Sequence, residues 1–238
     1  ESMSMKNKVI ITGGAGFIGS HLARRFLSEG FAVTVLDNLS TGTRENVPPG
    51  AEFIEMDLGE GEEYIKLANV SADAVLHLAG QSSGEASFAD PIKDMKSHVF
   101  STLQLLQFCQ EKGIKRFLYA SSMSVYGDPQ QLPVKEDDAL NPKTFYAVGK
   151  QTAEQYIRLF QKLGMDTTIF RLFSIYGPGQ NLQNKVQGMA SIFLSYMLEG
   201  ETVHVRGAKD RFRDFVYVED VVEAFFTAYN NSIAYGKT

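Results

Sequence analysis

Residues 12–19 read Thr-Gly-Gly-Ala-Gly-Phe-Ile-Gly, and this stretch decides the fold. The apolar run Val9–Thr12 leads into it and an amphipathic segment, Phe17–Ser28, follows it, which predicts a strand, a tight turn and a helix. Glycine lets the main chain approach a pyrophosphate closely, and the first helical turn offers free N–H groups and a partial positive charge. The stretch therefore predicts a dinucleotide-phosphate site. The residues expected at this site are Gly13, Gly16, Phe17, Ile18 and Gly19.

The same alternation of short apolar runs and longer amphipathic segments continues along the chain. It predicts a Rossmann-type α/β fold, because each connection between successive strands has room for a helix and parallel strands result. We expect this doubly wound parallel sheet to form an NAD-binding domain over residues 6–171. The predicted strands are Val9–Thr12, Ala32–Leu36, Glu52–Met56, Ala74–Leu78, Phe117–Ser121 and Thr167–Arg171. The predicted helices are Phe17–Ser28, Glu62–Ala68, Ile92–Lys112 and Tyr146–Leu163.

The pattern changes after Arg171. A glycine- and proline-containing loop at Tyr176–Asn181 is followed by a predicted helix at Ser191–Leu198, a short strand at Thr202–Val205 and a helix at Val221–Tyr229. We interpret residues 172–238 as a small substrate-binding lobe over the sheet. Its short length indicates an incomplete C-terminal lobe.

Composition narrows the classes of function. The 238 residues are 44% hydrophobic and carry a formal net charge of -5, which disfavours a nucleic-acid partner. The longest apolar runs fall short of the roughly 20 residues that a membrane span needs, and Glu1–Met5 does not resemble the start of a secretory signal. A single cysteine, Cys109, fits a reducing compartment. We expect a soluble cytoplasmic protein without a metal site.

Two acidic positions follow predicted strands. Asp37 ends the second strand, 18 residues beyond Gly19, where a carboxylate accepts hydrogen bonds from an adenosine ribose and repels a 2′-phosphate. NAD is therefore expected in preference to NADP. Asp57 and Leu58 follow the third strand, where they either flank the adenine or form an ordinary turn.

Tyr146 and Lys150 stand four residues apart on one face of a predicted helix. A nearby ammonium and a nicotinamide cation favour the phenolate, which makes Tyr146 a candidate acid/base. Ser122 follows a strand end, where ligands bind in open α/β sheets. The alternatives are an exposed helical pair and loop-capping serines, and capping is the preferred interpretation for Ser121 and Ser124.

Taken together, these pieces resemble the extended short-chain dehydrogenase/reductase family, and within it the nucleotide-sugar 4-epimerases of the UDP-glucose 4-epimerase type. The resemblance covers nearly the whole chain, and its seven markers occur in the order typical of the family. They are Thr12–Gly19, Asp37-Asn38, His77–Gly80, Ser121–Gly127, Tyr146–Lys150, Arg171–Pro178 and Arg213–Asp220.

The resemblance implies a role for individual residues. Ser122 corresponds to the catalytic Ser/Thr, Tyr146 to the acid/base and Lys150 to the lysine that binds the nicotinamide ribose. Arg213 falls where the family binds the substrate diphosphate, and a guanidinium fork suits that anion; the alternative is a surface arginine paired with Asp214 or Asp210. Tyr146 and Lys150 are also counted among the cofactor contacts. The further cofactor contacts implied are Asn38, Asp57, Leu58, Leu78, Ala79 and Gly80, and the substrate contacts are Ser122, Tyr146, Ser174 and Arg213.

The resemblance implies inversion at C4 of a UDP-hexose through a transient 4-ketose, with NAD unchanged overall. The dehydratases of the family carry an Asp-Glu pair after the Ser/Thr, and its decarboxylases usually carry a glutamate, whereas this chain has Met123 and Ser124. Neither side chain is a general acid at neutral pH, so elimination is disfavoured. The alternatives are a 4-ketoreductase, a 4,6-dehydratase and a dinucleotide-binding protein without turnover.

The chain also departs from the family pattern. His98 and Ser174 stand where asparagine is frequent, and we expect His98 to be a helix-face residue without a catalytic role. The segment Gln81–Asp90 is expected to shape the sugar pocket. In relatives the helices that correspond to Ile92–Lys112 and Tyr146–Leu163 pair as a dimer interface, so a homodimer is expected.

Overall fold

The computed structural model describes residues 7–184, 188–205, 210 and 212–238. Glu1–Met5, and Lys6 at the predicted domain start, lie outside these described residues.

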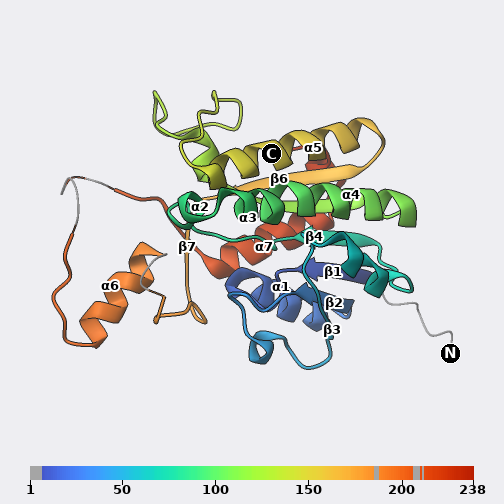
Figure 1. Cartoon of the computed structure of the whole chain (residues 1–238), viewed down its shortest axis with the longest axis horizontal. Coiled ribbons are helices and arrows are strands. Elements are labelled where there is room, and N and C mark those ends of the chain that lie inside the picture. The colour runs from blue at the N-terminus through green and yellow to red at the C-terminus, as the bar shows by residue number, and fades with distance from the viewer. Residues whose placement is uncertain (1–6, 185–187, 206–209, 211) are drawn as a thin grey trace.

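Figure 1 shows a parallel sheet with helices on both sides. The strands are β1 (Lys8–Thr12), β2 (Ala32–Asp37), β3 (Glu52–Glu55), β4 (Ala74–His77), β5 (Arg116–Ser122), β6 (Asp166–Leu172), β7 (Ser174–Tyr176) and β8 (Phe215–Tyr217). The α-helices are α1 (Phe17–Ser28), α2 (Ala86–Ala89), α3 (Pro91–Met95), α4 (Ser101–Lys112), α5 (Phe145–Lys162), α6 (Met189–Leu198) and α7 (Val218–Tyr229). The other helical turns are η1 (Arg44–Asn46), η2 (Gly61–Leu67), η3 (Lys96–Phe100), η4 (Met123–Tyr126) and η5 (Ser232–Ala234).

Six strands form the main sheet in the order β3-β2-β1-β4-β5-β6, all parallel. The order reverses between β1 and β4, and in open α/β sheets ligands bind beyond the carboxyl ends of the strands at such a point. The predicted doubly wound Rossmann fold is therefore confirmed. The first register pair of β1 and β2 joins Lys8 to Ala32.

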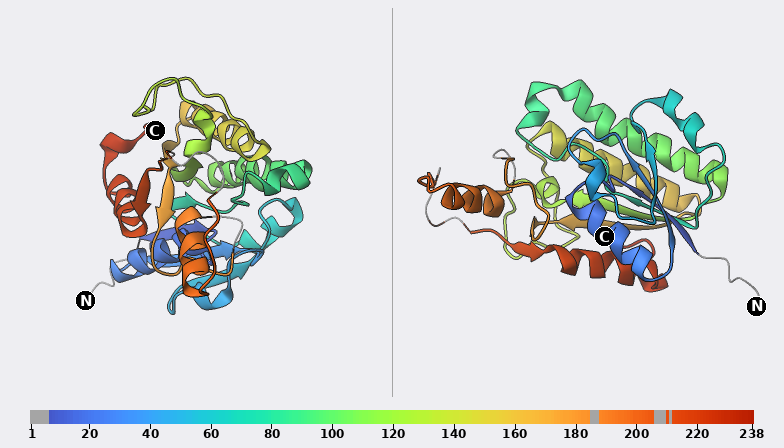
Figure 2. Two further views of the ribbon diagram at one scale, coloured as in Figure 1. Left: turned by 90° about the vertical axis from the view of Figure 1, so that its left-hand side faces the viewer. Right: turned by 90° about the horizontal axis from the view of Figure 1, so that it is seen from below.

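Each face of the sheet has its own hydrophobic core because successive side chains of a strand point to opposite faces. Ile10 of β1 packs with residues of α4 and α5, such as Leu105 and Ile157. Its neighbours Val9 and Ile11 pack on the other face with residues of α1 and α7. Figure 2 shows these two helical layers enclosing the sheet in a second orientation. Burial on both faces explains why the central strands β1 and β4 each contain three consecutive apolar residues, 9–11 and 74–76.

Helix α7 belongs to one of these layers. Val221, Val222 and Phe225 are buried in the core cluster that includes α1, and Phe225 stacks on Phe170 of β6 at a centroid distance of 4.1 Å. Helix α6, by contrast, stands away from the sheet at one end of the molecule, orange in Figure 1. The division of the chain between residues 171 and 172 stays a prediction. None of the described helices is both long and apolar enough to cross a membrane.

Two local predictions differ from the structure, and one small sheet was not predicted. The predicted strand Thr202–Val205 is wrong: these residues pair with none of the described strands, and Val205 is 59% exposed, so the alternating pattern of the segment buries no face. A two-stranded parallel sheet of β7 and β8 occurs instead. The predicted helix Glu62–Ala68 is the 3₁₀ segment η2.

The helix predicted over Ile92–Lys112 is continuous but not uniform. Between α3 and α4 the segment η3 is a π-helix. A π turn contains one residue more than an α turn would, and such turns are frequent at functional sites.

Candidate functional site

One cleft of about 1150 Å³ opens at the carboxyl ends of the strands. Every residue predicted to contact cofactor or substrate lines it, although the predicted positions are spread from Gly13 to Arg213. The structure therefore brings the whole predicted set together. The roles assigned to the individual residues stay predictions.

The glycine-rich loop at residues 12–19, called the phosphate loop below, leaves no room for side chains at Gly13 and Gly19. A ligand such as a dinucleotide can therefore approach the main chain closely. A Cβ on Gly13 would lie 2.8 Å from the amide nitrogen of Ala79, and Gly13 has a positive φ of 69°. A Cβ on Gly19 would lie 2.2 Å from the carbonyl oxygen of Gly13. The loop passes directly into α1, whose first N–H groups have no partners within the helix. An anion at this point meets main-chain donors at short range.

Asp37 lies at the end of β2, on the cleft wall, and its carboxylate is fixed by two main-chain donors. The amide of Ala15 donates to Oδ2 at 3.0 Å and the amide of Leu39 donates to Oδ1 at 2.8 Å. A carboxylate has further lone pairs, so Asp37 can still accept from a ribose. Next to it, Asn38 donates to Asp57 at 2.9 Å, which joins the ends of β2 and β3.

Ser122 and Tyr146 both line the cleft, and their side chains interact. Burial raises the pKa of Tyr146, a hydrogen bond with Ser122 opposes this shift, and the charge of Asp94 adds to it. Ser122 is held in turn by Ser124, whose hydroxyl and amide donate to Ser122 Oγ at 3.0 Å and 3.2 Å. The protein by itself therefore favours the neutral phenol of Tyr146.

Lys150 lies one helical turn beyond Tyr146 and is buried. Its ammonium donates to the carbonyl of Ala120 at 2.8 Å and lies 5.9 Å from the Tyr146 ring centroid. Burial lowers the pKa of Lys150 to about 8, while Asp94 and Glu154 oppose the shift. Its proton is thus held less tightly than that of an exposed lysine.

Glu154 lies one more turn along α5, is fully buried and connects β5 to β6. Ser121 donates to Glu154 Oε1 at 2.6 Å, and Arg171 donates to both carboxylate oxygens. The hydroxyl of Ser121 is therefore engaged in the protein interior. Among Ser121, Ser122 and Ser124, it is Ser122 that reaches Tyr146.

Ser174 and Arg213 lie at the cleft wall formed by β7 and the segment before β8. The amide of Ser174 donates to the carbonyl of Asp214 at 3.1 Å, which holds the two segments together. Arg213 donates to the carbonyl of Phe212 at 2.9 Å, and none of the ion pairs found among the described residues involves Arg213. Its charge remains available to an anion in the cleft.

Sequence reasoning missed several residues that line the cleft. Asn181, Gln180 and Lys93 carry polar side chains there, but single polar residues in loops and helix ends give no sequence signal of their own. Gln81 belongs to the segment that was expected to shape the sugar pocket, and the structure places it at the cleft. The signal that could have identified it is its position directly after Gly80, four residues beyond the end of β4.

Comparison with known proteins agrees with this geometry. The sequence profile of the NAD dependent epimerase/dehydratase family matches residues 9–237. A UDP-glucose 4-epimerase of Mycolicibacterium smegmatis is 35% identical over 228 residues, which cover 93% of this chain and 72% of that protein. UDP-glucuronic acid decarboxylase 1 of Xenopus tropicalis is 31% identical over 96% of this chain and 55% of that protein. The crystal structure of Thermus thermophilus UDP-glucose 4-epimerase in complex with NAD superimposes with a TM-score of 0.85, at 36% identity, over 93% of this chain and 74% of that one.

These relatives differ in the reaction that their names state, but they share one scaffold. The prediction of NAD as the cofactor is confirmed at the level of the family, whose description includes it. The glycine-rich loop at residues 12–19, Asp37 at the end of β2, and Ser122, Tyr146 and Lys150 all contribute to the lining of a single cleft. This chain therefore belongs to the NAD-dependent epimerase/dehydratase family.

Proposed function

We propose that this chain is a nucleotide-sugar 4-epimerase that inverts C4 of a UDP-hexose through a transient 4-ketose. The observation that carries the proposal is the contact of Ser122 with Tyr146, beside Lys150, in the same cleft as the phosphate loop. A cleft that held a dinucleotide without turnover would have no need of this arrangement.

In this proposal the chain moves one proton and orients two ligands. Tyr146 takes the proton of the sugar 4-hydroxyl and later returns it, and Ser122 hydrogen-bonds the same hydroxyl. When bound, NAD would supply reversible hydride transfer at C4, on either face of the sugar. Lys150 contacts the nicotinamide ribose, and its positive charge favours the Tyr146 phenolate.

The side chains after Ser122 favour epimerisation over elimination. Met123 lines the cleft and has no exchangeable proton, and Ser124 donates its hydroxyl to Ser122. Elimination at C5 and C6 needs a general acid beside the catalytic serine, and neither side chain is one at neutral pH. Decarboxylation is a second candidate reaction, because one relative is named as a UDP-glucuronic acid decarboxylase.

Arg213 and Ser174 are the proposed substrate contacts, with the guanidinium of Arg213 on the diphosphate. A homodimer is also proposed. Its support is an exposed apolar face on α2, α3 and α5 that includes Phe88, Ile92 and Val148. Exposed apolar patches of this kind mark protein interfaces.

The test is to incubate the purified chain and NAD separately with UDP-glucose, UDP-galactose and their N-acetyl forms, and to resolve the products by NMR of the anomeric protons. Interconversion without net production of NADH supports 4-epimerase activity and identifies the sugar. Release of CO₂ from UDP-glucuronate would favour decarboxylation instead. NAD binding without conversion of any nucleotide sugar would favour a binding protein.

A further inference from the structure

Asp94 is a buried carboxylate beside the site that the mechanism above does not use. It lies on α3 and is 2% exposed. Among the described residues, no lysine or arginine lies within ion-pair distance of it, and its one ion-pair neighbour is His98, at 3.6 Å. Burying a carboxylate is costly unless it is paired or hydrogen-bonded, so Asp94 needs partners in its surroundings.

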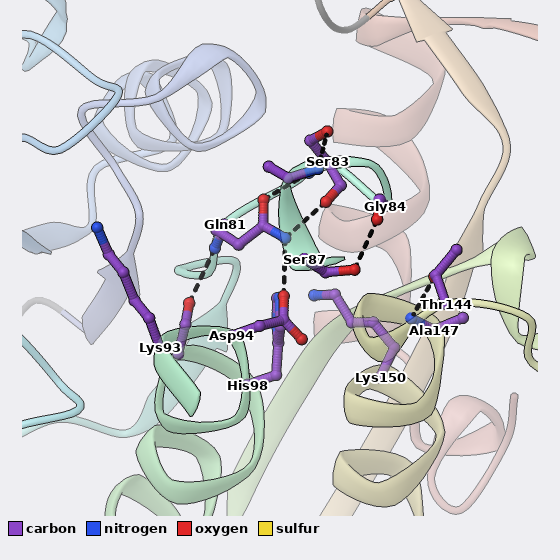
Figure 3. A network of polar contacts seen from close by, with 12 residues as sticks. Gln81, Ser83, Gly84, Ser87, Lys93, Asp94, His98, Thr144, Ala147 and Lys150 are labelled. Atoms are coloured by element: carbon purple, nitrogen blue, oxygen red, sulfur yellow. Dashed lines mark hydrogen bonds and ion pairs between the residues drawn. The ribbon is translucent and has the colours of Figure 1, made fainter. Parts of the chain in front are cut away.

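Gln81 supplies the hydrogen bond. Its side-chain amide donates to Asp94 Oδ1 at 2.7 Å and to the carbonyl of Ser83 at 2.6 Å, and its Oε1 accepts from the amide of Ser83 at 2.7 Å. The amide of Gln81 donates to Ser97 at 2.9 Å. Figure 3 shows this chain of contacts running from the loop to Asp94. Asp94 thus anchors residues 81–83, a loop whose first two residues line the cleft.

His98 does not supply the missing positive charge. Burial lowers the pKa of His98 well below its usual value and the charge of Lys150 adds to the shift, so the ring is neutral at physiological pH. Neither ring nitrogen makes a hydrogen bond within the described part of the chain. The ring instead fills space, edge-on to Tyr146 with centroids 5.1 Å apart.

Lys150 is the positive charge that faces Asp94. Its ammonium points toward the Asp94 carboxylate in Figure 3. The helices approach closely here because Gly149 has no side chain, and a Cβ there would lie 3.1 Å from His98 Cβ and 3.6 Å from Asp94 Oδ2. Asp94 is also the largest contribution that opposes the loss of the Lys150 proton.

Other groups face Lys150 from the neighbouring elements. Glu154 on α5 adds a second negative charge, which Arg171 already pairs. Tyr119 on β5 lies with its ring centroid 4.9 Å from the ammonium. His77 on β4 is neutral, because burial and Lys150 lower its pKa to about 3. Asp94 is thus the charge near Lys150 that no arginine neutralises.

We infer that Asp94 is a positioning residue for the proposed reaction: its buried carboxylate holds the loop 81–83 at the cleft and keeps Lys150 charged beside Tyr146. The two actions are separable because asparagine retains the acceptor for Gln81 and removes only the charge. The inference rests on the proposed function for its relevance to catalysis, but both actions are measurable without turnover.

The charge is tested by NMR titration of the chain labelled with ¹³C-lysine, in which the ε-methylene signal of Lys150 is identified by its loss in Lys150→Met. We expect the Lys150 transition near pH 8 to move to lower pH in Asp94→Asn. It should stay in place in Glu111→Gln, a matched change at an exposed carboxylate on α4. Equal transitions in the wild type and Asp94→Asn would overturn the inference.

The anchor is tested by hydrogen exchange of the Ser83 amide. Asp94→Ala should accelerate this exchange about tenfold, the equivalent of one lost hydrogen bond, whereas Asp94→Asn should leave it unchanged. Exchange that is unaffected by Asp94→Ala would refute the anchoring action.

If no nucleotide sugar is converted but both measurements give the expected results, the proposed function fails and the action of Asp94 on Lys150 and the loop stands. Conversion of a nucleotide sugar together with an unmoved Lys150 transition would support the proposed function and overturn the inference about Asp94.

Discussion

Arg171 binds Glu154 through two parallel hydrogen bonds, from Nε to Oε1 at 3.0 Å and from Nη2 to Oε2 at 2.8 Å. Both side chains are almost wholly buried. Burial raises the pKa of Glu154, but the hydrogen bonds of Arg171 and Ser121, with the nearby arginine charges, outweigh it and leave the pKa below its usual value. The stabilisation from the pair is therefore present near neutral pH and is lost as the pH falls through the pKa of Glu154.

Arg171→Met should leave the buried carboxylate without its main partner. We expect the free energy of unfolding at neutral pH to fall by about 3 to 5 kcal/mol, the range measured for broken buried pairs. Urea denaturation measures this. Arg158→Met is the matched control, because Arg158 contacts the same carboxylate but is 38% exposed, and its loss should cost less than about 1 kcal/mol. Equal losses in the two variants would contradict the assignment.

Tyr146→Phe removes the hydroxyl that contacts Ser122 and leaves the ring in place. Since general acid–base catalysis contributes roughly 100- to 10,000-fold, kcat on the identified sugar should fall by that factor while NAD remains bound. Tyr156→Phe on the same helix is the control and should keep wild-type activity. A fully active Tyr146→Phe enzyme would exclude the proposed mechanism.

Lys150 makes stability depend on pH in the alkaline range. Its pKa of about 8 in the folded chain lies below the ordinary 10.5, so the unfolded chain binds more protons between these values and stability rises with pH there. The free energy of unfolding of the wild type, relative to Lys150→Met, should increase by roughly 3 kcal/mol across this window. Parallel denaturation series at several pH values measure the difference. A constant difference would mean that Lys150 keeps an ordinary pKa.

Gly19→Ala places a Cβ where the carbonyl of Gly13 lies, so the phosphate loop must shift. We expect NAD affinity to fall by tenfold or more, because loss of about 1.4 kcal/mol already has that effect. Gly61→Ala is the control, since its nearest contact is the flexible end of Gln104. Calorimetric titration with NAD compares the two variants. Unchanged affinity in Gly19→Ala would place the pyrophosphate elsewhere.

Val148→Glu introduces a charge in the proposed dimer face. There Phe88 and Phe145 pack edge-on, 5.3 Å apart, and Val148 is 48% exposed. We expect the variant to be a monomer by light scattering at concentrations where the wild type is a dimer. Ile233→Glu, at an exposed residue of η5, should not change the mass. A wild type that is monomeric at all concentrations would refute this interface.

Much of the sheet was predictable because local pattern and burial agree. Residues 9–11 of β1 and 74–76 of β4 are apolar, since helices cover both faces, and the glycine stretch marks the turn into α1. The cleft was predictable for a related reason. Parallel strands place their carboxyl ends together, so residues such as Gly13, Asp37 and Ser122 converge although they are distant in sequence.

The failures have physical causes as well. β7 and β8 have three residues each, too few for a periodic signal. The segment Thr202–Val205 has the strand pattern, but it pairs with no strand among the described residues. Asp94 was missed because an aspartate in a helical pattern is normally exposed. Its burial depends on Gly149, which lies 55 positions away and belongs to another helix.

The π turn η3 divides one long helix into two parts with separate orientations. In α4 the buried positions, Leu105 and Cys109 among them, are fixed by the core, whereas in α3 Asp94 faces the site. Each residue of an α-helix turns the chain by about 100°, and a π turn carries one residue more than an α turn, so a regular α-helix over these same residues would turn Asp94 by about that angle relative to α4. The extra residue of η3 therefore sets the phase between the face of α3 that meets the site and the face of α4 that meets the core.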